Sequence, residues 1–150
     1  MNKDQIIAKL ESRWADFKKS FEGLNEDEMI KPGPAGGWSI KDILAHVATW
    51  EEEAFKNLPL IVEDKRLPRY NDLYGGINAF NTIMAEENRR LPLDEVIRWL
   101  EDTHRRLLDY LRGIPEEQFG SKTRFRRRLA ADTYNHYLEH TDSILALRRM

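Results

Sequence analysis

The spacing of apolar residues limits the fold of this chain more than any other feature, because they recur every three or four positions along most of its length. Such spacing places apolar side chains on one face of a helix. No segment shows the strict alternation that is typical of a half-buried strand. The sequence therefore predicts an all-α protein. The first stripe consists of Ile6, Leu10, Trp14, Phe17, Phe21 and Leu24.

Loop and cap signals divide the pattern into four long helices. The proline- and glycine-rich stretch at 31–37 is a loop, and Ser39 with Asp42 forms a capping-box pattern at the start of the second helix. A long, less regular connection follows Pro59. These features are typical of a single-domain four-helix bundle, residues 1–150, with a crossover between the second and third helices. The expected helices cover about 3–22, Ser39 to Pro59, Pro92 to Gly113 and 129–148, with a helical piece at 77–90.

Composition excludes several classes of site and partner. The chain has no cysteine, so disulfides, thiolate metal sites and cysteine nucleophiles are excluded, and any metal must be held by histidine and carboxylate. A net charge of −2 gives no general attraction to nucleic acid or anionic membranes. The N-terminus lacks the apolar core of a signal peptide, and no apolar run approaches membrane-spanning length. We expect a soluble cytoplasmic protein with no nucleic-acid and no membrane partner.

Two of the four histidines lie in the stretch TYNHYLEH, residues 133–140. In a helix, His136 and His140 project from the same face, and both point towards the interior of a bundle. A buried imidazole needs a hydrogen bond, a charged partner or a metal. The pair alone leaves two interpretations open. The histidines could bond to hydroxyls such as those of Thr133 or Tyr137, or they could be two of the three ligands of a catalytic metal.

The third ligand could come from either of two helices. His46 lies on the flank of the apolar stripe of the second helix, and His104 lies in the stripe of the third. His104 also forms an E-x-x-H pair with Glu101, as in di-iron carboxylate bundles, but those bundles need two such motifs. Thr133 stands where a glutamate would have to precede His136, so the di-iron interpretation carries little weight.

Two segments resemble the DinB-like superfamily. GGWSIKDILAHVATWEEEA, residues 36–54, carries the most specific pattern, W-S-x-K-D-x-L-x-H, and the late H-x-x-x-H of residues 133–144 is the second. The resemblance implies an up-down-down-up bundle. It also implies a divalent metal, zinc or nickel, bound by His46, His136 and His140, which leaves His104 without a ligand role.

The resemblance further implies the kind of chemistry. A three-histidine metal keeps an open position that can lower the pKa of water or hold an external low-molecular-weight thiol. We therefore expect a metal-dependent hydrolase or a thiol-dependent transferase that acts on a small electrophilic molecule. Glu53 and Asp132 follow and precede the ligands on the same helix faces, and either could act as a general base or orient an imidazole. Each is also typical of a solvated surface acid. Family habit favours a homodimer.

Alternative functions remain at this point. The N-A-F-N stretch at 78–81 resembles the ClbS-like branch, which implies a metal-independent protein that binds a small molecule or confers toxin resistance. A purely structural bundle is a third possibility. The acidic run Glu51–Glu53 is expected to be a solvated face. The basic cluster consists of Lys122, Arg124, Arg126, Arg127 and Arg128. It could dock an anion, or it could be a solvated linker that balances charge at a helix end.

Overall fold

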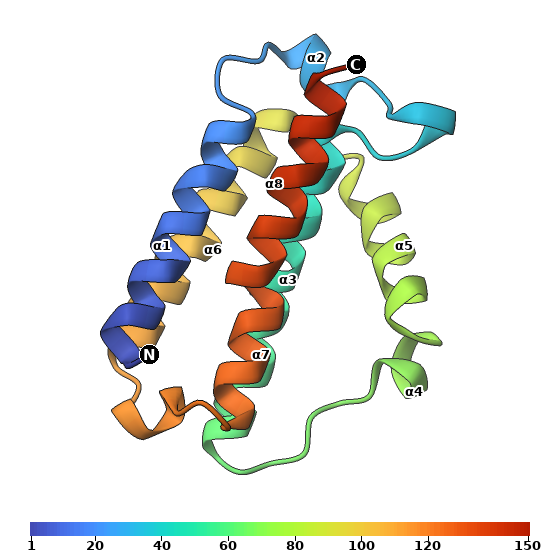
Figure 1. The fold of residues 1–150 in the computed structure, drawn as a ribbon. Helices are drawn as coiled ribbons and strands as arrows, with labels where there is room; N and C mark the ends of the chain where they lie inside the picture. Colours follow the sequence, from blue (N-terminus) through green and yellow to red (C-terminus); the bar gives the residue numbers. More distant parts are fainter.

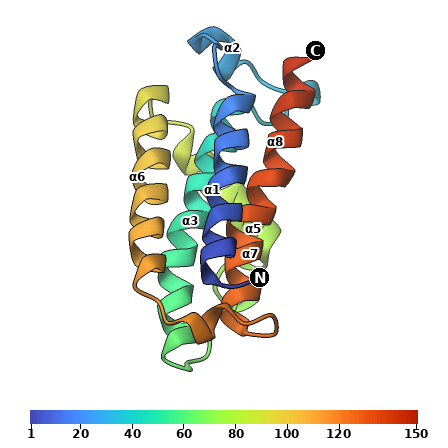
Figure 2. The same cartoon turned by 60° about the vertical axis from the view of Figure 1, so that its left-hand side comes forward.

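The computed structural model describes all 150 residues as an all-helical chain without strands, which confirms the predicted fold class. Four long helical segments lie side by side (Figures 1 and 2). Helix α3 packs against α6, α7 and α8, and α1 packs against α8. The long segments are α1 (Lys3–Ser20), α3 (Ile40–Val62), α6 (Leu93–Arg112), and α7 (Arg124–Asp132) continued by α8 (Tyr134–Arg148). The connections contain α2 (Glu26–Ile30), η1 (Pro34–Gly36), α4 (Tyr70–Tyr74), α5 (Ile77–Asn88) and η2 (Glu116–Phe119).

The start of α3 is the one that the sequence predicts. The Asp42 backbone N–H donates to Ser39 Oγ at 3.1 Å, and the Ser39 N–H donates to Asp42 Oδ2 at 3.0 Å. These two bonds satisfy donors that the first turn of a helix leaves free. The cap therefore fixes the register of α3, and with it the direction in which His46 projects.

Helix α3 ends later than predicted. It continues past Pro59 to Val62, because Leu58 and Ile61 are both buried in the core and hold the last turn in place. A proline inside a helix removes one hydrogen bond and crowds the carbonyl four residues earlier, and the burial of these two side chains offsets that cost. Burial thus outweighs the local stop signal.

The last long segment also differs from the prediction. It begins at Arg124 rather than near 129, with Thr123 Oγ1 accepting from the Arg126 N–H, so most of the basic cluster is helical rather than a linker. It then breaks at Thr133, whose φ and ψ are −126° and −94°. The Thr133 hydroxyl donates to the Leu129 carbonyl at 2.6 Å, a back-bond that bends helices. Neither glycine nor proline marks this break, so no breaker residue predicts it.

Within the crossover, α5 runs beside α3 and contacts it (Figure 1). Trp50 Nε1 donates to Asn81 Oδ1 at 2.9 Å, and Asn88 Nδ2 donates to Thr49 Oγ1 at 3.0 Å. Through these bonds α5 forms a wall beside α3. The expected helical piece at 77–90 is thus present as α5, whereas the short helix α4 was not predicted.

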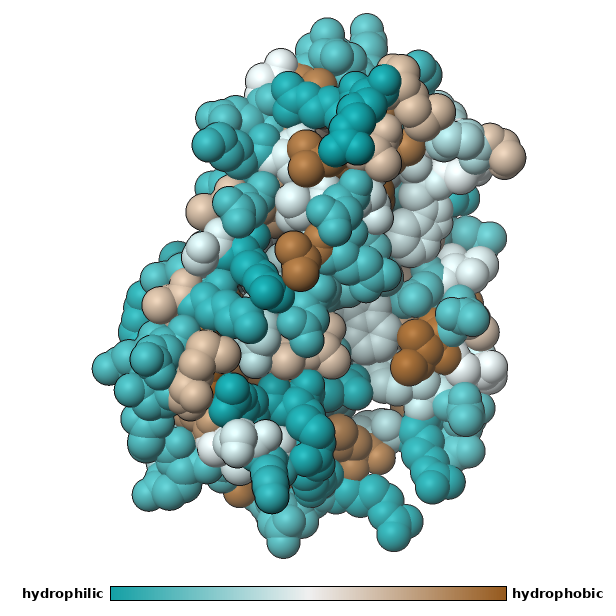
Figure 3. Space-filling view, in the orientation of Figure 1, coloured by the Kyte–Doolittle hydropathy of each residue, from teal (hydrophilic) through white to brown (hydrophobic).

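The core joins all four long segments in one cluster of 25 buried residues. Trp14 and Phe17 contribute from α1, Leu44 and Leu58 from α3, and Tyr137 from α8. Polar side chains dominate the face of the molecule seen in Figure 3. None of the helices combines the length and the apolar character that crossing a membrane requires.

Candidate metal centre

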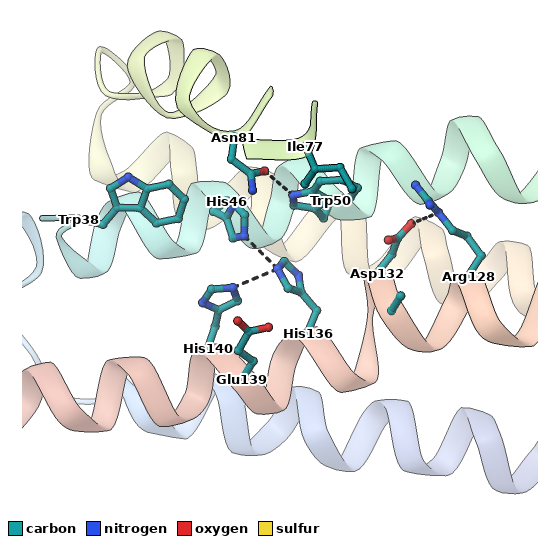
Figure 4. Close-up of a pocket in the computed structure, with 11 residues that line it drawn as sticks. Trp38, His46, Trp50, Ile77, Asn81, Arg128, Asp132, His136, Glu139 and His140 are labelled. Atoms are coloured by element: carbon teal, nitrogen blue, oxygen red, sulfur yellow. Dashed lines mark hydrogen bonds and ion pairs between the residues drawn. The ribbon is translucent and has the colours of Figure 1, made fainter. Parts of the chain in front are cut away.

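Three histidines meet where α3 faces α8. His136 Nε2 lies 2.9 Å from His46 Nε2 and 3.0 Å from His140 Nε2, and the three nitrogens all lie within 4.8 Å of one another. Figure 4 shows the three rings turned towards a common point. The structure therefore brings together the three residues that the family resemblance named.

The imidazoles of this trio are not satisfied by the protein. The Nδ1 atoms of His136 and His140 are buried and have no hydrogen-bond partner. A neutral imidazole has one N–H and one lone pair. If the lone pairs are on Nε2, the electron-rich Nε2 atoms of neighbouring rings face one another. If the protons are on Nε2, the lone pairs of the buried Nδ1 atoms of His136 and His140 have no hydrogen-bond donor. A cation between the three Nε2 atoms removes the conflict in the first arrangement.

The trio is held in the neutral form. Burial, together with a smaller effect of nearby imidazoles, lowers the pKa of His46 to about 3 and that of His136 to about 2. Burial also lowers the pKa of His140, although Glu139 opposes this shift. Neutral imidazole is the form that binds metals. At neutral pH all three side chains therefore offer lone pairs without first losing a proton.

The spacing suits a single divalent ion. Two nitrogens that are each about 2.0–2.1 Å from one zinc ion lie roughly 3.0–3.4 Å apart. The two distances from His136 Nε2, 2.9 and 3.0 Å, are close to this range, and the ligand atoms of all three histidines lie within 4.8 Å of one another. Imidazole nitrogen is a preferred donor for zinc, copper, iron and nickel. The residues present thus fit the metal that the resemblance implies.

A cavity of about 420 Å³ opens over the trio. Trp38 lies at one end, with its ring 4.8 Å from that of His46, and Ile77 and Asn81 of α5 line the cavity beside the trio. The lining residues are Trp38, His46, Trp50, Ile77, Asn81, Arg128, Ala131, Asp132, His136, Glu139 and His140 (Figure 4). The site therefore combines an apolar wall with a few converging polar groups, as small-molecule sites commonly do.

The two acids predicted to act beside the metal have different positions. Asp132 is buried, lines the cavity and accepts from Arg128 Nε at 2.9 Å. Burial raises its pKa to about 7, although Arg128 opposes the shift. Glu53 does not line the cavity. Its carboxylate accepts from the Tyr70 hydroxyl and from Lys56 Nζ, both at 2.8 Å. A catalytic role for either acid stays a prediction, and only Asp132 faces the cavity.

The expectation that Glu51–Glu53 forms a solvated face is wrong. Glu51 is fully buried and Glu53 is 6% exposed, because α3 is covered by α5, α6, α7 and α8 and keeps only a narrow solvent-facing arc. Glu51 accepts from the Tyr137 hydroxyl at 2.8 Å and from Thr103 Oγ1 at 3.0 Å. Burial raises the pKa of Glu51, and these hydrogen bonds oppose the rise.

His104 lies in this second cluster and not at the trio. Its ring stacks on Trp14 with 3.9 Å between centroids, and its Nδ1 lies 3.3 Å from the Tyr137 hydroxyl and 3.5 Å from Glu51. The hydroxyls that were expected to satisfy His136 and His140 thus act elsewhere. Tyr137 donates to Glu51, and Thr133 donates to the Leu129 carbonyl. The simpler interpretation of TYNHYLEH loses its hydrogen-bond partners.

Most of the basic cluster stabilises a turn. Arg124 Nη2 donates to the Lys65 carbonyl at 3.2 Å, Arg126 Nη1 to the Phe119 carbonyl at 3.4 Å, and Arg127 Nη1 to the Lys122 carbonyl at 2.8 Å. Arg128 alone among these arginines lines the cavity.

Sequence reasoning missed Glu139. It is exposed at the rim of the cavity, and Figure 4 shows its carboxylate beside the trio. A signal was present, because residues 136–140 read H-x-x-E-H, the inverted zinc-binding pattern in which two histidines flank a glutamate.

Sequence comparison decides the family. Residues 9–143 match the family model of the DinB superfamily, which covers most of the chain and all three histidines of the trio. The chain belongs to the DinB superfamily. A comparison with curated protein sequences gives no match.

Solved structures of three proteins have the same fold. The colibactin self-resistance protein ClbS, in complex with a double-stranded DNA, is 13% identical with a TM-score of 0.80, and the alignment covers 99% of this chain and 96% of that one. The Sibling Lethal Factor Precursor DfsB is 16% identical with a TM-score of 0.83 and the same coverage. An uncharacterised protein from Escherichia coli UTI89 is 9% identical with a TM-score of 0.78, covering 99% and 93%. These similarities support the ClbS-like resemblance at the level of fold.

Proposed function

We propose that this DinB superfamily protein is a metal-dependent enzyme that acts on a small electrophilic molecule, either by hydrolysis or by transfer of an external thiol. One observation carries the proposal. Three neutral imidazoles converge through their Nε2 atoms beneath an open cavity. Neutral imidazoles that turn their nitrogens towards one shared point can all bind one metal ion there.

The chain would contribute binding, orientation and proton transfer. A zinc or nickel ion held by His46, His136 and His140 supplies Lewis acidity towards water or a thiol. Asp132 lines the same cavity and, with its pKa near 7, can accept or release a proton at its carboxylate near neutral pH. Trp38 gives the carbon skeleton of a substrate an apolar surface to pack against.

The finer features of fold and assembly are part of the same proposal. We infer an up-down-down-up order for the four long segments within a single domain. In Figure 1 the chain runs upwards in α1 and α8 and downwards in α3 and α6, which supports that order. We also propose a homodimer, and light scattering of the purified protein would test it.

A second candidate function follows from the resemblance to ClbS. The protein could bind a small molecule or confer toxin resistance without a metal, because the cavity is present whether or not the trio binds an ion. The solved ClbS structure contains a double-stranded DNA, which runs against the expectation of no nucleic-acid partner. A mobility-shift assay with double-stranded DNA would test that expectation directly.

Metal analysis separates the two candidates. Protein purified without chelator should contain about one zinc or nickel ion per chain, and both His46→Ala and His136→Ala should lose it. His104→Gln is the matched control, since it removes a buried histidine outside the trio and should keep the metal. Metal-free wild-type protein, or unchanged metal content in His136→Ala, would disprove the metal-dependent enzyme. Either result would leave metal-independent binding of a small molecule as the remaining candidate function.

A further inference from the structure

The cavity has a cationic end that the metal does not explain. Arg128 is the one lysine or arginine among the residues that line it, and it projects from α7 just before the break at Thr133. Figure 4 places Arg128 on one side of the trio and Trp38 on the other. We propose that Arg128 forms a subsite for a carboxylate group of the substrate.

The guanidinium is held in place and keeps a free edge. Its Nε donates to Asp132 Oδ2 at 2.9 Å, and its Nη2 donates to the Tyr70 hydroxyl at 3.3 Å. Its Nη1 has no partner in the protein, and the side chain is 22% exposed. A fixed guanidinium loses little conformational entropy when it binds a carboxylate, whose planar shape it matches.

Two aromatic rings also lie against the Arg128 guanidinium. The guanidinium carbon lies 5.9 Å from the Trp50 ring centre and 5.8 Å from that of Tyr70. Such stacking leaves the edge of the guanidinium free for a ligand. Arg128 and Ile77 also line a second cavity of about 430 Å³ beside the first. Arg128 therefore lies between the two cavities, where it can contact a ligand that extends from the trio.

Asp132 pairs with Arg128, and Glu53 accepts from the Tyr70 hydroxyl beside it, but neither acid bonds to the Nη1 edge. Asp132 uses the Nε side of the guanidinium, and Glu139 lies at the trio, away from Arg128 (Figure 4). Asp72 lines only the second cavity, together with Arg69. The ligand class that fits is an organic acid with an apolar body, which would pack against Trp38 and the Ile77 wall. The placement of the ligand's electrophilic carbon at the trio rests on the proposed function. Binding of the ligand's carboxylate to Arg128 does not.

Phenylacetate and its neutral counterpart phenylacetamide test the subsite. Both are titrated into metal-free, ¹⁵N-labelled protein, so that the carboxylate cannot bind a metal, and the Trp50 Nε1–H signal reports binding. We expect phenylacetate to bind about tenfold or more tightly than phenylacetamide, the effect of a charge-assisted hydrogen bond. Arg128→Gln should abolish the preference, while Arg124→Gln, whose side chain lies outside the cavity, should keep it.

Equal affinity for acid and amide, no binding of either, or an unchanged preference in Arg128→Gln would overturn the proposal. Arg128→Lys is the second variant should Arg128→Gln fail to fold. It retains the charge without the planar fork, and we expect it to lower the preference at least about threefold. Titration of His46→Ala separates this proposal from the proposed function. A preference that persists in that variant supports the subsite even if no metal is ever found.

Discussion

Two polar clusters face the interior of this bundle. The open one joins α3 and α8, and the closed one joins α3, α6 and α8. The closed cluster consists of Glu51, Thr103, His104 and Tyr137, and the open cluster is the trio of His46, His136 and His140. In the closed cluster each hydroxyl donates to Glu51 and the imidazole stacks on Trp14. In the open cluster the buried Nδ1 atoms of His136 and His140 have no partner.

The difference shows how a structural histidine can be told from a ligand. Burial alone does not separate them, since His104 is 6% exposed and His140 is 9% exposed. What separates them is whether the protein completes the hydrogen bonds. His104 lies 3.3 Å from a tyrosine hydroxyl, whereas His140 Nε2 meets only another imidazole. An incomplete cluster beside a cavity is where an external ion or ligand can compensate.

Removing the acceptor of the closed cluster should have the largest effect. Glu51→Ala leaves Tyr137, Thr103 and His104 without their shared partner in the core, and we expect a loss of about 3–5 kcal/mol in the free energy of unfolding. Urea unfolding measures it. Glu52→Ala is the control, because Glu52 is half-buried and pairs with Arg106, and it should cost about 1 kcal/mol or less. Equal losses would show that the closed cluster is not the stabilising one.

Metal should stabilise the open cluster. Zinc or nickel at about 100 times its dissociation constant should raise the unfolding free energy of the wild type by about 2.7 kcal/mol. Thermal unfolding with and without the ion measures this. His136→Ala should show no shift and His104→Gln should keep it. A shift of the same size in His136→Ala would mean that the ion binds elsewhere.

The pH dependence of stability should report Asp132. Its pKa is about 7 in the folded protein against an ordinary 3.8, because burial outweighs Arg128 and Glu53 adds to the rise. From pH 4 to 7 the unfolded chain releases this proton first, so the contribution of Asp132 to stability falls through that window and is constant above it. Asp132→Asn should therefore gain stability relative to wild type as pH rises, by roughly 1–3 kcal/mol. Urea unfolding at pH 4.5, 6 and 8 tests it, and a difference that is flat with pH would contradict the shift.

The smallest expected effect concerns the wall of the open cluster. Asn81→Ala removes the acceptor of Trp50 Nε1 and should cost about 0.5–1.5 kcal/mol, less than any change in the closed cluster. Thr82→Ala is the neighbouring control, because Thr82 is exposed and bonds only within α5. Thermal unfolding measures both. If Asn81→Ala proves as costly as Glu51→Ala, α5 belongs to the stabilising core.

Much of the fold could be predicted from the chain, since local signals mark most helix ends. Ser39 and Asp42 placed the start of α3 correctly, and apolar spacing placed α1 and α6. The errors lie where tertiary packing opposes a local signal. Burial of Ile61 carries α3 past Pro59, and the back-bond of Thr133 interrupts the last segment without a breaker residue.

The residues of the site differ in how well the sequence predicted them. His46, His136 and His140 could be named, because the family pattern specifies them. Glu51 was misjudged, because three acids in a row are usually solvated and only the packing of four elements around α3 buries this one. Arg128 could not be separated from its cluster, because adjacent residues of a helix point in different directions and packing decides which one meets the cavity.

The sequence by itself thus determined the helical class and the capped start of α3, because periodicity and capping are local properties, and its family resemblance named the three converging histidines. Tertiary structure decided which polar groups are satisfied. His104 and His136 are both imidazoles on inward helix faces, and no local signal distinguishes them. Only the arrangement of α1, α3, α6 and α8 gives one a tyrosine and a carboxylate and leaves the other facing two more imidazoles beneath a cavity.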